Sequence, residues 1–362
     1  MKKILGGMVF AYFLFLFFAA PYSIDSKRVV NIYNWADFMD PVILEKFTQE
    51  TGIKVNYNVF DSNEVLEAKL LSGKTGYDVV FPTAYPYFQR LKQAKVFKKI
   101  DKTKLKNFPL IDVSILNKLS PIDPDHEYGI PYLWGTSGFA YNIEKVENIL
   151  GKPLPESWVT LFDIKILEKL AFCGISLIDS PVELFPAVMK SQGKNPNSSD
   201  PKDLQSAVQV LLPLRPFIRK FTSVIINDLV NGDLCLAHTW STDARIARDR
   251  SKKNNIRYVT PREGTSLWID LMAIPEDAPN PEEAHIFIDF ILRPENIAII
   301  TNTVQCANPI RSSNPLINPK ILTDEIIYPS KETLEKSYTD QLFSSSFERM
   351  RNRAMIKVKT GR

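Results

Sequence analysis

The sequence predicts an α/β protein of two lobes from its length, its composition and its alternating pattern. Its 362 residues exceed the usual domain of about 150 residues, so two cores are expected. Hydrophobic residues make up 44% and charged residues 24% of the chain, which is typical of a folded globular protein. Short apolar runs alternate with helical patterns, and 25 prolines interrupt the chain too often for a coiled coil or a bundle of long helices.

Strands and helices are expected to alternate from Val29 onward. Short apolar runs predict strands, and apolar residues three or four positions apart predict helices. The expected strands span 29–33, 53–60, 77–81, 139–141, 175–178, 234–240, 256–260 and 266–274. The expected helices span 41–51, 62–72, 181–191, 202–212, 281–292 and 294–303.

Local signals set the ends of the first helices. Asp40 suits the N-cap of the first helix, Pro41 its first turn and Gly52 its C-terminal end. Asp61 is expected to cap the second helix, which Gly73 ends. Because these helices alternate with strands, the first part of the chain is predicted to have α/β winding.

The middle third of the chain repeats this alternation less regularly, which fits a second lobe. Its polar run 194–203 is predicted as a surface loop inside that lobe and not as a domain boundary. The chain closes on the basic residues Arg349, Arg351, Arg353, Lys357, Lys359 and Arg362. A solvent-exposed helix face is the favoured interpretation of these residues, and an interaction tail is the alternative.

The N-terminus has the order of a secretory signal peptide. Lys2 and Lys3 precede an uncharged apolar run over 4–20 that Pro21 closes, and we place the signal peptide at 1–23. An uncleaved membrane anchor is the alternative, because the run is just short of a bilayer-spanning helix and lacks a clean cleavage site. No cysteine follows the run, so a lipid anchor is not indicated. The small formal charge of +4 gives no indication of nucleic acid binding.

The chain carries no recognised sequence motif for catalysis, metal binding or cofactor binding. Gly73-Lys74-Thr75 lacks the glycine that a phosphate-binding loop needs five positions earlier, where Ala68 stands. The chain has no nucleophile elbow, zinc-protease or Cys-x-x-Cys motif, and its three histidines are widely separated. A carboxylate pair for glycoside hydrolysis stays open, since its spacing is spatial. No cofactor, metal site or catalytic residue is therefore predicted.

Three of the five tryptophans lie close in sequence to an aspartate. The pairs are Trp35 with Asp37, Trp240 with Asp243, and Trp268 with Asp270. The first two follow expected strands, where ligands gather in α/β sheets, and the third lies on one face of a strand. Indole faces attract cations and carboxylates accept charge-assisted hydrogen bonds from ammonium groups, so the pairs indicate an organic-amine pocket. Chance pairing of core tryptophans with helix-capping aspartates is the alternative.

Four strings of residues match a known family. They are Val30–Phe38, Phe60–Glu67, Pro131–Trp134 and Asn227–Asp233. With them the chain resembles the periplasmic polyamine-binding proteins of bacterial ABC transporters, and the putrescine-binding branch is most similar. The resemblance implies a two-lobed periplasmic binding protein fold of type II, with mixed sheets flanked by helices and a hinge between the lobes. The implied first lobe spans 28–133 and 260–304, the second lobe spans 134–259 and 305–362, and the hinge segments are 134–139 and 259–265.

The resemblance also implies the ligand-binding residues. They are Trp35, Asp37, Phe38, Thr83 and Tyr85 on the first-lobe wall, and Glu183, Trp240 and Asp243 on the facing wall. Trp268 and Asp270 are expected to complete the cage. Asp270 is expected to bind one ammonium end of the ligand, with Glu183 and Asp243 available toward the other. The residues that depart from the putrescine branch are Ala36, Phe38, Trp268 and Cys306. Tyr85 and Trp268 instead look like the spermidine-preferring branch.

The cysteines fit one disulfide and one free thiol in an oxidising compartment, and their spacing alone does not choose the pair. The resemblance implies a disulfide between Cys173 and Cys235 within the second lobe. It leaves Cys306 free near the pocket.

The resemblance implies an exported receptor and not an enzyme. Such a receptor captures a polyamine, putrescine narrowly ahead of spermidine, and delivers it to an ABC permease in the inner membrane. It is expected to be periplasmic and monomeric, with no cofactor and no nucleic acid partner. A sensor that passes lobe closure to a membrane regulator is the alternative, and an exported enzyme has less support. The residues that depart from the putrescine branch, Cys306 among them, also leave open another ligand, such as an amino acid or an acetylated amine.

Overall fold

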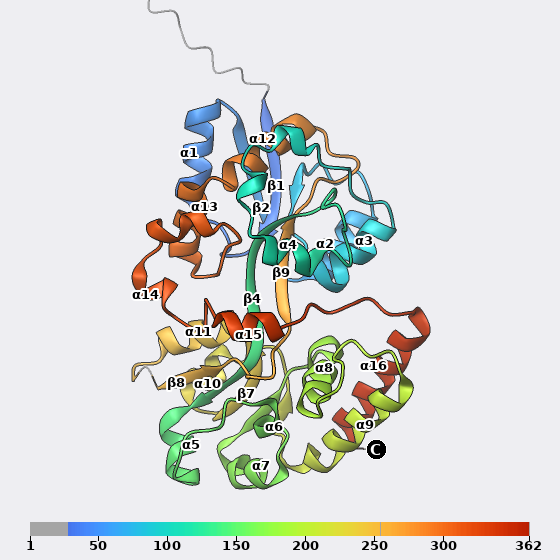
Figure 1. Cartoon of the computed structure of the whole chain (residues 1–362), viewed down its shortest axis with the longest axis vertical. Helices are drawn as coiled ribbons and strands as arrows, with labels where there is room; N and C mark the ends of the chain where they lie inside the picture. The colour runs from blue at the N-terminus through green and yellow to red at the C-terminus, as the bar shows by residue number, and fades with distance from the viewer. Residues whose placement is uncertain (1–27, 254, 362) are drawn as a thin grey trace, which may run out of the picture.

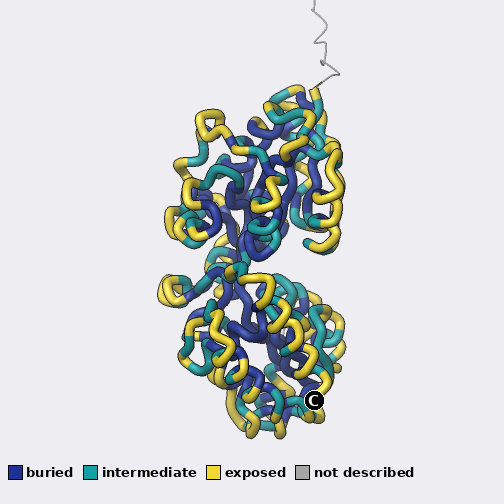
Figure 2. Tube along the Cα trace, turned by 90° about the vertical axis from the view of Figure 1, so that its right-hand side faces the viewer, coloured by how far each residue is buried: buried dark blue, intermediate teal, exposed yellow. Residues whose placement is uncertain are grey.

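The computed structural model of the chain describes residues 28–253 and 255–361 and has two α/β lobes joined at a waist (Figure 1). Figure 2 shows the buried trace inside each lobe and the exposed trace around it. This architecture confirms the fold class expected from the sequence. The expected signal peptide lies outside the described residues. Within the two described ranges, no helix is both long and apolar enough to cross a bilayer.

The first lobe is built on a parallel sheet of three strands in the order β2-β1-β3. The strands are β1 (Val29–Trp35), β2 (Lys54–Phe60) and β3 (Val79–Val80). Trp35 at the end of β1 pairs with Phe60 at the end of β2. β1 starts at the far end of the lobe and runs toward the other lobe (Figure 1). The carboxyl ends of the parallel strands therefore face the waist, and this edge of an α/β sheet is where ligands bind.

Helix α1 (Pro41–Thr51) begins and ends where its sequence signals predict. The Asp40 carboxylate accepts a hydrogen bond of 2.9 Å from the Val42 amide, which satisfies one of the free donors of the first turn. Gly52 follows the helix with φ 71°, in the left-handed region that glycine adopts without strain. The predicted ends of this helix are confirmed.

Helix α2 (Asn63–Leu71) has a different N-cap from the predicted one. Ser62 is the cap, because its hydroxyl accepts a hydrogen bond of 3.3 Å from the Val65 amide. The expectation that Asp61 caps this helix is therefore wrong by one residue. Both side chains are favourable caps, so the sequence alone gives no clear choice between neighbours.

The second sheet is mixed, in the order β6-β5-β7-β4-β8, with β9 paired to β4. Its strands are β4 (Ile130–Asn142), β5 (Ile175–Leu177), β6 (Lys220–Phe221), β7 (Leu236–Trp240), β8 (Ile256–Val259) and β9 (Leu267–Met272). β4 has 13 residues, all buried. Its first part pairs with β9 and its last part with β7 and β8, so one strand passes through the waist into the second lobe (Figure 1).

The remaining helices surround the two sheets. They are α3 (Gln89–Gln93), α4 (Val113–Leu119), α5 (Ile143–Leu150), α6 (Trp158–Leu161), α7 (Ile164–Leu170), α8 (Pro181–Ser191), α9 (Pro201–Leu211), α10 (Ile226–Asn231), α11 (Ser241–Arg250), α12 (Pro281–Ile291), α13 (Pro294–Val304), α14 (Pro319–Leu322), α15 (Lys331–Lys336) and α16 (Ser345–Thr360). α8 has its predicted bounds. α16 carries Arg349, Arg351, Arg353, Lys357 and Lys359. Arg351 is only 3% exposed, so the expectation of a solvent-exposed face is wrong for this residue.

The chain after α13 differs from the expected division into lobes. Cys306 and Ile310 are buried in one core of the first lobe, and Ile317 and Ile321 in the other. The expected assignment of all residues from 305 onward to the second lobe is therefore wrong, because these apolar side chains are covered by the first lobe. The chain then passes the waist at α15, and α16 packs against the second lobe (Figure 1).

Two glycines of the expected hinge segment, Gly135 and Gly138, lie inside β4. A Cβ on Gly135 would stand 2.2 Å from Cζ2 of Trp268, and a Cβ on Gly138 would stand 2.3 Å from the Val259 carbonyl oxygen. Both positions exclude any larger side chain. The glycines therefore allow close packing at the waist, a common role for glycine within a strand.

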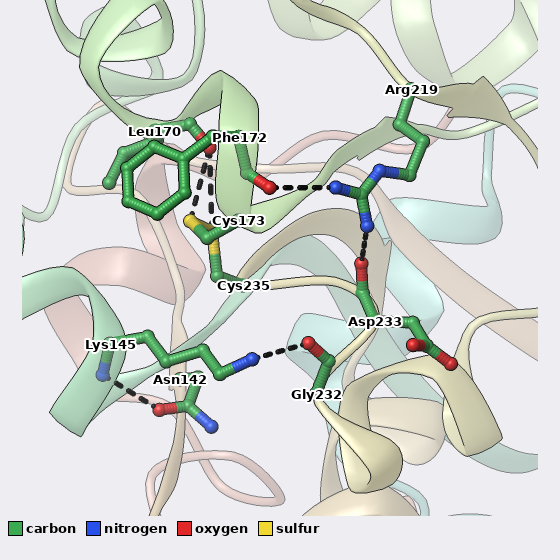
Figure 3. Close-up of a disulfide and its surroundings, with 9 residues drawn as sticks. All are labelled: Asn142, Lys145, Leu170, Phe172, Cys173, Arg219, Gly232, Asp233 and Cys235. Carbon is green, nitrogen blue, oxygen red and sulfur yellow. Dashed lines mark hydrogen bonds between the residues drawn. A yellow bond between two sulfur atoms is a disulfide. The ribbon is translucent and has the colours of Figure 1, made fainter.

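A disulfide joins Cys173 to Cys235, as the resemblance implied. Figure 3 shows that it ties the turn after α7 to the chain entering β7. The loops beside it are held by Arg219, which donates hydrogen bonds to the carbonyl groups of Phe172 and Asp233 (Figure 3). The crosslink spans 62 residues of sequence within the second lobe.

Candidate functional site

The predicted ligand residues come from elements of both lobes. The first lobe supplies Trp35, Asp37 and Phe38 after or at the end of β1, Thr83 and Tyr85 after β3, and Trp268 and Asp270 in β9. The second lobe supplies Glu183 in the first turn of α8, Trp240 at the end of β7 and Asp243 in the first turn of α11. The parallel strand ends and the paired strand β9 therefore carry most of the set.

Asp270 has a buried carboxyl at the centre of the first-lobe residues. Its side chain is 3% exposed, and Thr83 Oγ1 donates to its Oδ1 at 2.7 Å. Asn63 Nδ2 donates in turn to Thr83 Oγ1 at 3.0 Å, which fixes the direction of the hydroxyl. Burial raises the pKa of Asp270 to about 7, although Thr83 and the nearby indole of Trp35 favour the charged form. Trp35 Nε1 itself makes no fully formed hydrogen bond.

Glu183 has the corresponding position in the second lobe and is 7% exposed. Its Oε2 accepts a hydrogen bond of 2.6 Å from Ser137 Oγ, and its Oε1 accepts one of 3.0 Å from Trp240 Nε1. Burial raises the pKa of Glu183 above its usual range, and both donors act against this rise. The structure thus brings Glu183 and Trp240 into contact, and Ser137 of β4 binds the same carboxylate.

Asp243 is a third acid of this region. Burial raises the pKa of Asp243 to about 6. No described residue donates a hydrogen bond that would stabilise the ionised carboxylate. The thiol of Cys306 is free and buried, which raises its pKa to about 12, and the charges of Asp270 and Asp243 add to the rise. Both acids therefore lie near this thiol, and the implied place of Cys306 at the pocket agrees with its surroundings.

Aromatic rings line the same region. The ring centroid of Trp35 lies 4.6 Å from that of Phe60 and 6.3 Å from that of Phe38. Trp268 lines a small cavity together with Trp134 and Cys306. Its Nε1 is buried without a hydrogen-bond partner. The rings offer faces for apolar chain segments and for cations.

Six of the ten predicted residues take no part in these two hydrogen-bonded groups. Three of them, Trp35, Asp243 and Trp268, are described above, and the other three are Asp37, Phe38 and Tyr85. Asp37 is exposed on a turn, with φ 60°, and forms no hydrogen bond with the other predicted residues. Phe38 is half-buried, and its carbonyl group accepts a hydrogen bond from the Tyr132 hydroxyl. Tyr85 is 7% exposed and faces the C-terminal residues Thr339 and Asp340.

Sequence reasoning missed three residues that contact the predicted set or stand beside it. They are Asn63, which orients Thr83; Ser137, which bonds Glu183; and Asp340, whose charge interacts with Glu183. Asn63 lies within one of the matched strings, so that string could have indicated it. Ser137 and Asp340 had no such signal, because they reach the site only through the path of the chain across the waist.

Gly135→Ala is expected to lower ligand affinity about tenfold or more. The added methyl group would overlap the Trp268 indole, whose Cζ2 and Cε2 would lie 2.2 and 2.6 Å away, and would force the ring out of place. Binding calorimetry on the folded variant measures the loss. Gly151→Ala is the control for glycine strain without a clash: its φ of 72° strains an added side chain, but nothing lies within 4 Å of its Cβ. Unchanged affinity in Gly135→Ala would contradict the expectation.

Within 28–253 and 255–361, no group of three or more histidine, cysteine, aspartate or glutamate side chains is arranged to hold a metal. Two buried carboxyls instead stand beside indole rings, Asp270 near Trp35 and Glu183 at Trp240, a combination that binds ammonium groups.

Comparison with known proteins identifies the family. Residues 43–326 match the bacterial extracellular solute-binding protein family. The chain is 41% identical over 342 residues to the putrescine-binding periplasmic protein SpuD of Pseudomonas aeruginosa, covering 93% of both chains. It is 40% identical over 343 residues to the putrescine-binding periplasmic protein PotF of Escherichia coli, covering 93% of this chain and 92% of that protein.

A solved structure agrees with these relatives. The spermidine/putrescine ABC transporter substrate-binding protein PotD of Streptococcus pneumoniae matches with a TM-score of 0.84 and 30% identity, covering 92% of this chain and 99% of that one. These matches confirm the resemblance found in the sequence strings. Because the family match and the relatives both extend over most of the chain, this protein belongs to the bacterial extracellular solute-binding proteins.

Proposed function

We propose that this protein is a periplasmic receptor that captures a polyamine between its lobes and delivers it to an ABC permease of the inner membrane. Putrescine is the favoured ligand and spermidine the second. The names of the relatives support this ligand class, since they bind putrescine or both amines. The receptor acts as a monomer, needs no cofactor and catalyses no reaction.

The observation that carries the proposal is a pair of buried acids, one in each lobe. Asp270 is 3% exposed and Glu183 is 7% exposed, and neither forms an ion pair with a described residue. A buried carboxylate without a counter-ion is costly, so each site favours a ligand that brings a positive charge. A flexible amine with a charge near each end supplies both charges at once.

The arrangement of the acids also supports a closing mechanism. Asp270 and Thr83 are expected to bind one ammonium group, and Glu183 and Asp243 are available for the other. Trp35, Trp240 and Trp268 would cover the methylene chain, whose desolvation contributes about 0.8 kcal/mol per CH₂. Because the ligand gains all these contacts only when the lobes approach, it stabilises the closed state by its higher affinity for that state.

Polyamine affinity is expected to fall steeply as pH decreases from 8 to 5. The pKa of Asp270 is about 7 and that of Asp243 about 6 in the free protein, so both bind protons in this range. The ammonium ligand needs the ionised carboxylates and stays charged itself, so binding must release those protons. Asp270 alone accounts for a loss of about a hundredfold. Calorimetry in buffers of different ionisation enthalpy measures the released protons, and pH-independent affinity would contradict this expectation.

Titration calorimetry of the mature chain tests the function directly. The protein is unfolded and refolded first to remove any ligand carried through purification, and then titrated with putrescine, spermidine, cadaverine and agmatine. Sub-micromolar binding of one amine without its chemical conversion is expected. If no amine binds, the ligand proposal is wrong, and the departures at Ala36, Phe38, Trp268 and Cys306 are the first substitutions to reverse.

A further inference from the structure

Helix α11 of the second lobe lies at the waist, against the chain of the first lobe (Figure 1). Its first residue, Ser241, lines a small cavity together with residues 305–307, which follow α13 in the first lobe. One turn further, Arg245 Nη2 donates to the Val304 carbonyl oxygen at 3.4 Å. Arg248 comes one more turn along, and residues four and seven positions apart share one side of a helix. This face of α11 therefore meets the first lobe.

Arg248 forms an ion pair with Asp324 of the first-lobe chain. The distance from Arg248 Nη2 to Asp324 Oδ2 is 2.6 Å, and the two side chains are 21% and 16% exposed. The other carboxylate oxygen, Oδ1, accepts a hydrogen bond of 3.1 Å from the Ile326 amide, which fixes the direction of the carboxylate. Asp324 follows α14, whose Ile321 is buried in a core of the first lobe. The ion pair therefore joins the two lobes, and its partial burial makes it stronger and less sensitive to salt than an exposed pair.

Residues 324–328, which we call the strap, enter the cores of both lobes. Ile326 is 8% exposed and belongs to the same core as two alanines of α11, Ala244 and Ala247. The next residue, Ile327, is 4% exposed and is buried in a core of the first lobe. A single short segment of the first-lobe chain thus contacts α11 in two ways, by the ion pair and by apolar packing.

The position of α11 decides where the Asp243 carboxylate stands. Asp243 lies in the first turn of the helix, and Arg248 lies about 8 Å further along the helix axis. No described residue donates a hydrogen bond to the Asp243 carboxylate, so its place depends on the helix backbone. The first turn is tied to β4, where the Thr136 amide donates to Ser241 Oγ at 3.2 Å. The helix is therefore fixed at its start by β4 and toward its end by the strap.

We propose that Arg248 and Asp324 are positioning residues: their ion pair holds α11 against the first lobe and so places the Asp243 carboxylate for the ligand. This inference rests on the proposed function and adds to it a contact outside the ligand pocket. A binding group must be held within about 0.5 Å of its productive position, and the residues that support it set this precision. The ion pair is the charged part of this support, so its loss is expected to let the end of α11 move.

Asp324→Asn is expected to lower polyamine affinity about fivefold. Asparagine keeps an oxygen for the Ile326 amide and removes the charge that pairs with Arg248, so the strap is kept and the ion pair is lost. Calorimetry with putrescine and spermidine measures the loss for the amine that the wild type binds more tightly. Glu144→Gln is the matched control, because it breaks an ion pair of 2.9 Å with Lys253 within the second lobe. It should leave the affinity within about twofold of the wild type.

The effect of Asp324→Asn should largely disappear once Asp243 has lost its charge. In the Asp243→Asn background, adding Asp324→Asn is expected to lower the affinity less than about twofold, because a positioning residue acts through the group that it positions. An equal loss in both backgrounds would overturn the inference. An affinity of the single variant Asp324→Asn within about twofold of the wild type would overturn it too, whatever its melting temperature, since the ion pair would then serve stability alone.

Hydrogen exchange of the ligand-free protein separates this inference from the proposed function. The α11 amides of Asp324→Asn should exchange about tenfold faster than those of the wild type, because loss of the ion pair favours local opening of the helix. Glu144→Gln should keep the wild-type rates. If the wild type binds no amine, the proposed function is wrong, and faster exchange in Asp324→Asn would still show that the ion pair holds α11. If the wild type binds an amine and the α11 amides of Asp324→Asn exchange at wild-type rates, the receptor function stands and the inference is wrong.

Discussion

Asp270→Asn is expected to weaken putrescine binding about thirtyfold or more. The substitution keeps the shape of the side chain but removes the charge that an ammonium group would pair with in a buried position. Loss of one member of a buried charge pair costs about 2 kcal/mol or more, which corresponds to about thirtyfold in affinity. Calorimetry at pH 8, where the wild-type carboxyl is ionised, measures this loss. Affinity within threefold of the wild type would show that Asp270 does not bind the ligand.

The ligand-free Asp270→Asn variant should be at least as stable as the wild type at pH 8. Burial raises the pKa of Asp270 in the folded protein to about 7, above that of the unfolded chain. The folded state therefore loses stability as pH rises through this range, because it must hold a buried charge that the unfolded chain exposes to water. Asparagine removes that cost. Asp277→Asn, an exposed position of the same lobe, is the control for the change in net charge.

Local chemistry made much of the fold predictable. The acid, proline and glycine around α1 are near-neighbours in sequence, and their effect on helix ends depends on the backbone of a few residues. β4 was predicted only over 139–141, although it spans 13 residues. Pro131, Gly135 and Gly138 weaken a strand pattern, and their positions are explained only by what packs against them in three dimensions.

The same limit applies to the candidate site. Pairs of tryptophan and aspartate close in sequence were visible because one strand or strand end carries both members. Glu183 and Ser137 are 46 residues apart, and Ser266 and Asp340 are 74 residues apart, yet each pair shares a hydrogen bond. Such partners are set by how β4 and the C-terminal segment cross the waist. No local pattern encodes that path, so sequence reasoning named one member of the first pair and neither of the second.

Removing the disulfide is expected to lower the free energy of unfolding by about 4 kcal/mol. The crosslink between Cys173 and Cys235 spans 62 residues, and a closed segment of this length restricts the unfolded chain by about that amount. Urea unfolding of the double variant Cys173→Ala/Cys235→Ala measures the change. Cys306→Ala is the matched control, since it also removes a buried sulfur but breaks no crosslink.

Polyamine affinity of the double variant should stay within threefold of the wild type while it is folded. Cys235 directly precedes β7, whereas Trp240 ends it, so the strand separates the disulfide from the predicted ligand residues by about 17 Å. The groups around the disulfide, among them Lys145, Arg219 and Asp233, include none of those residues (Figure 3). If the free energy of unfolding of the double variant falls by less than about 1 kcal/mol, the unfolded chain is already restricted without the crosslink. A large loss of polyamine affinity in the folded double variant would instead mean that the disulfide positions the second-lobe wall of the pocket.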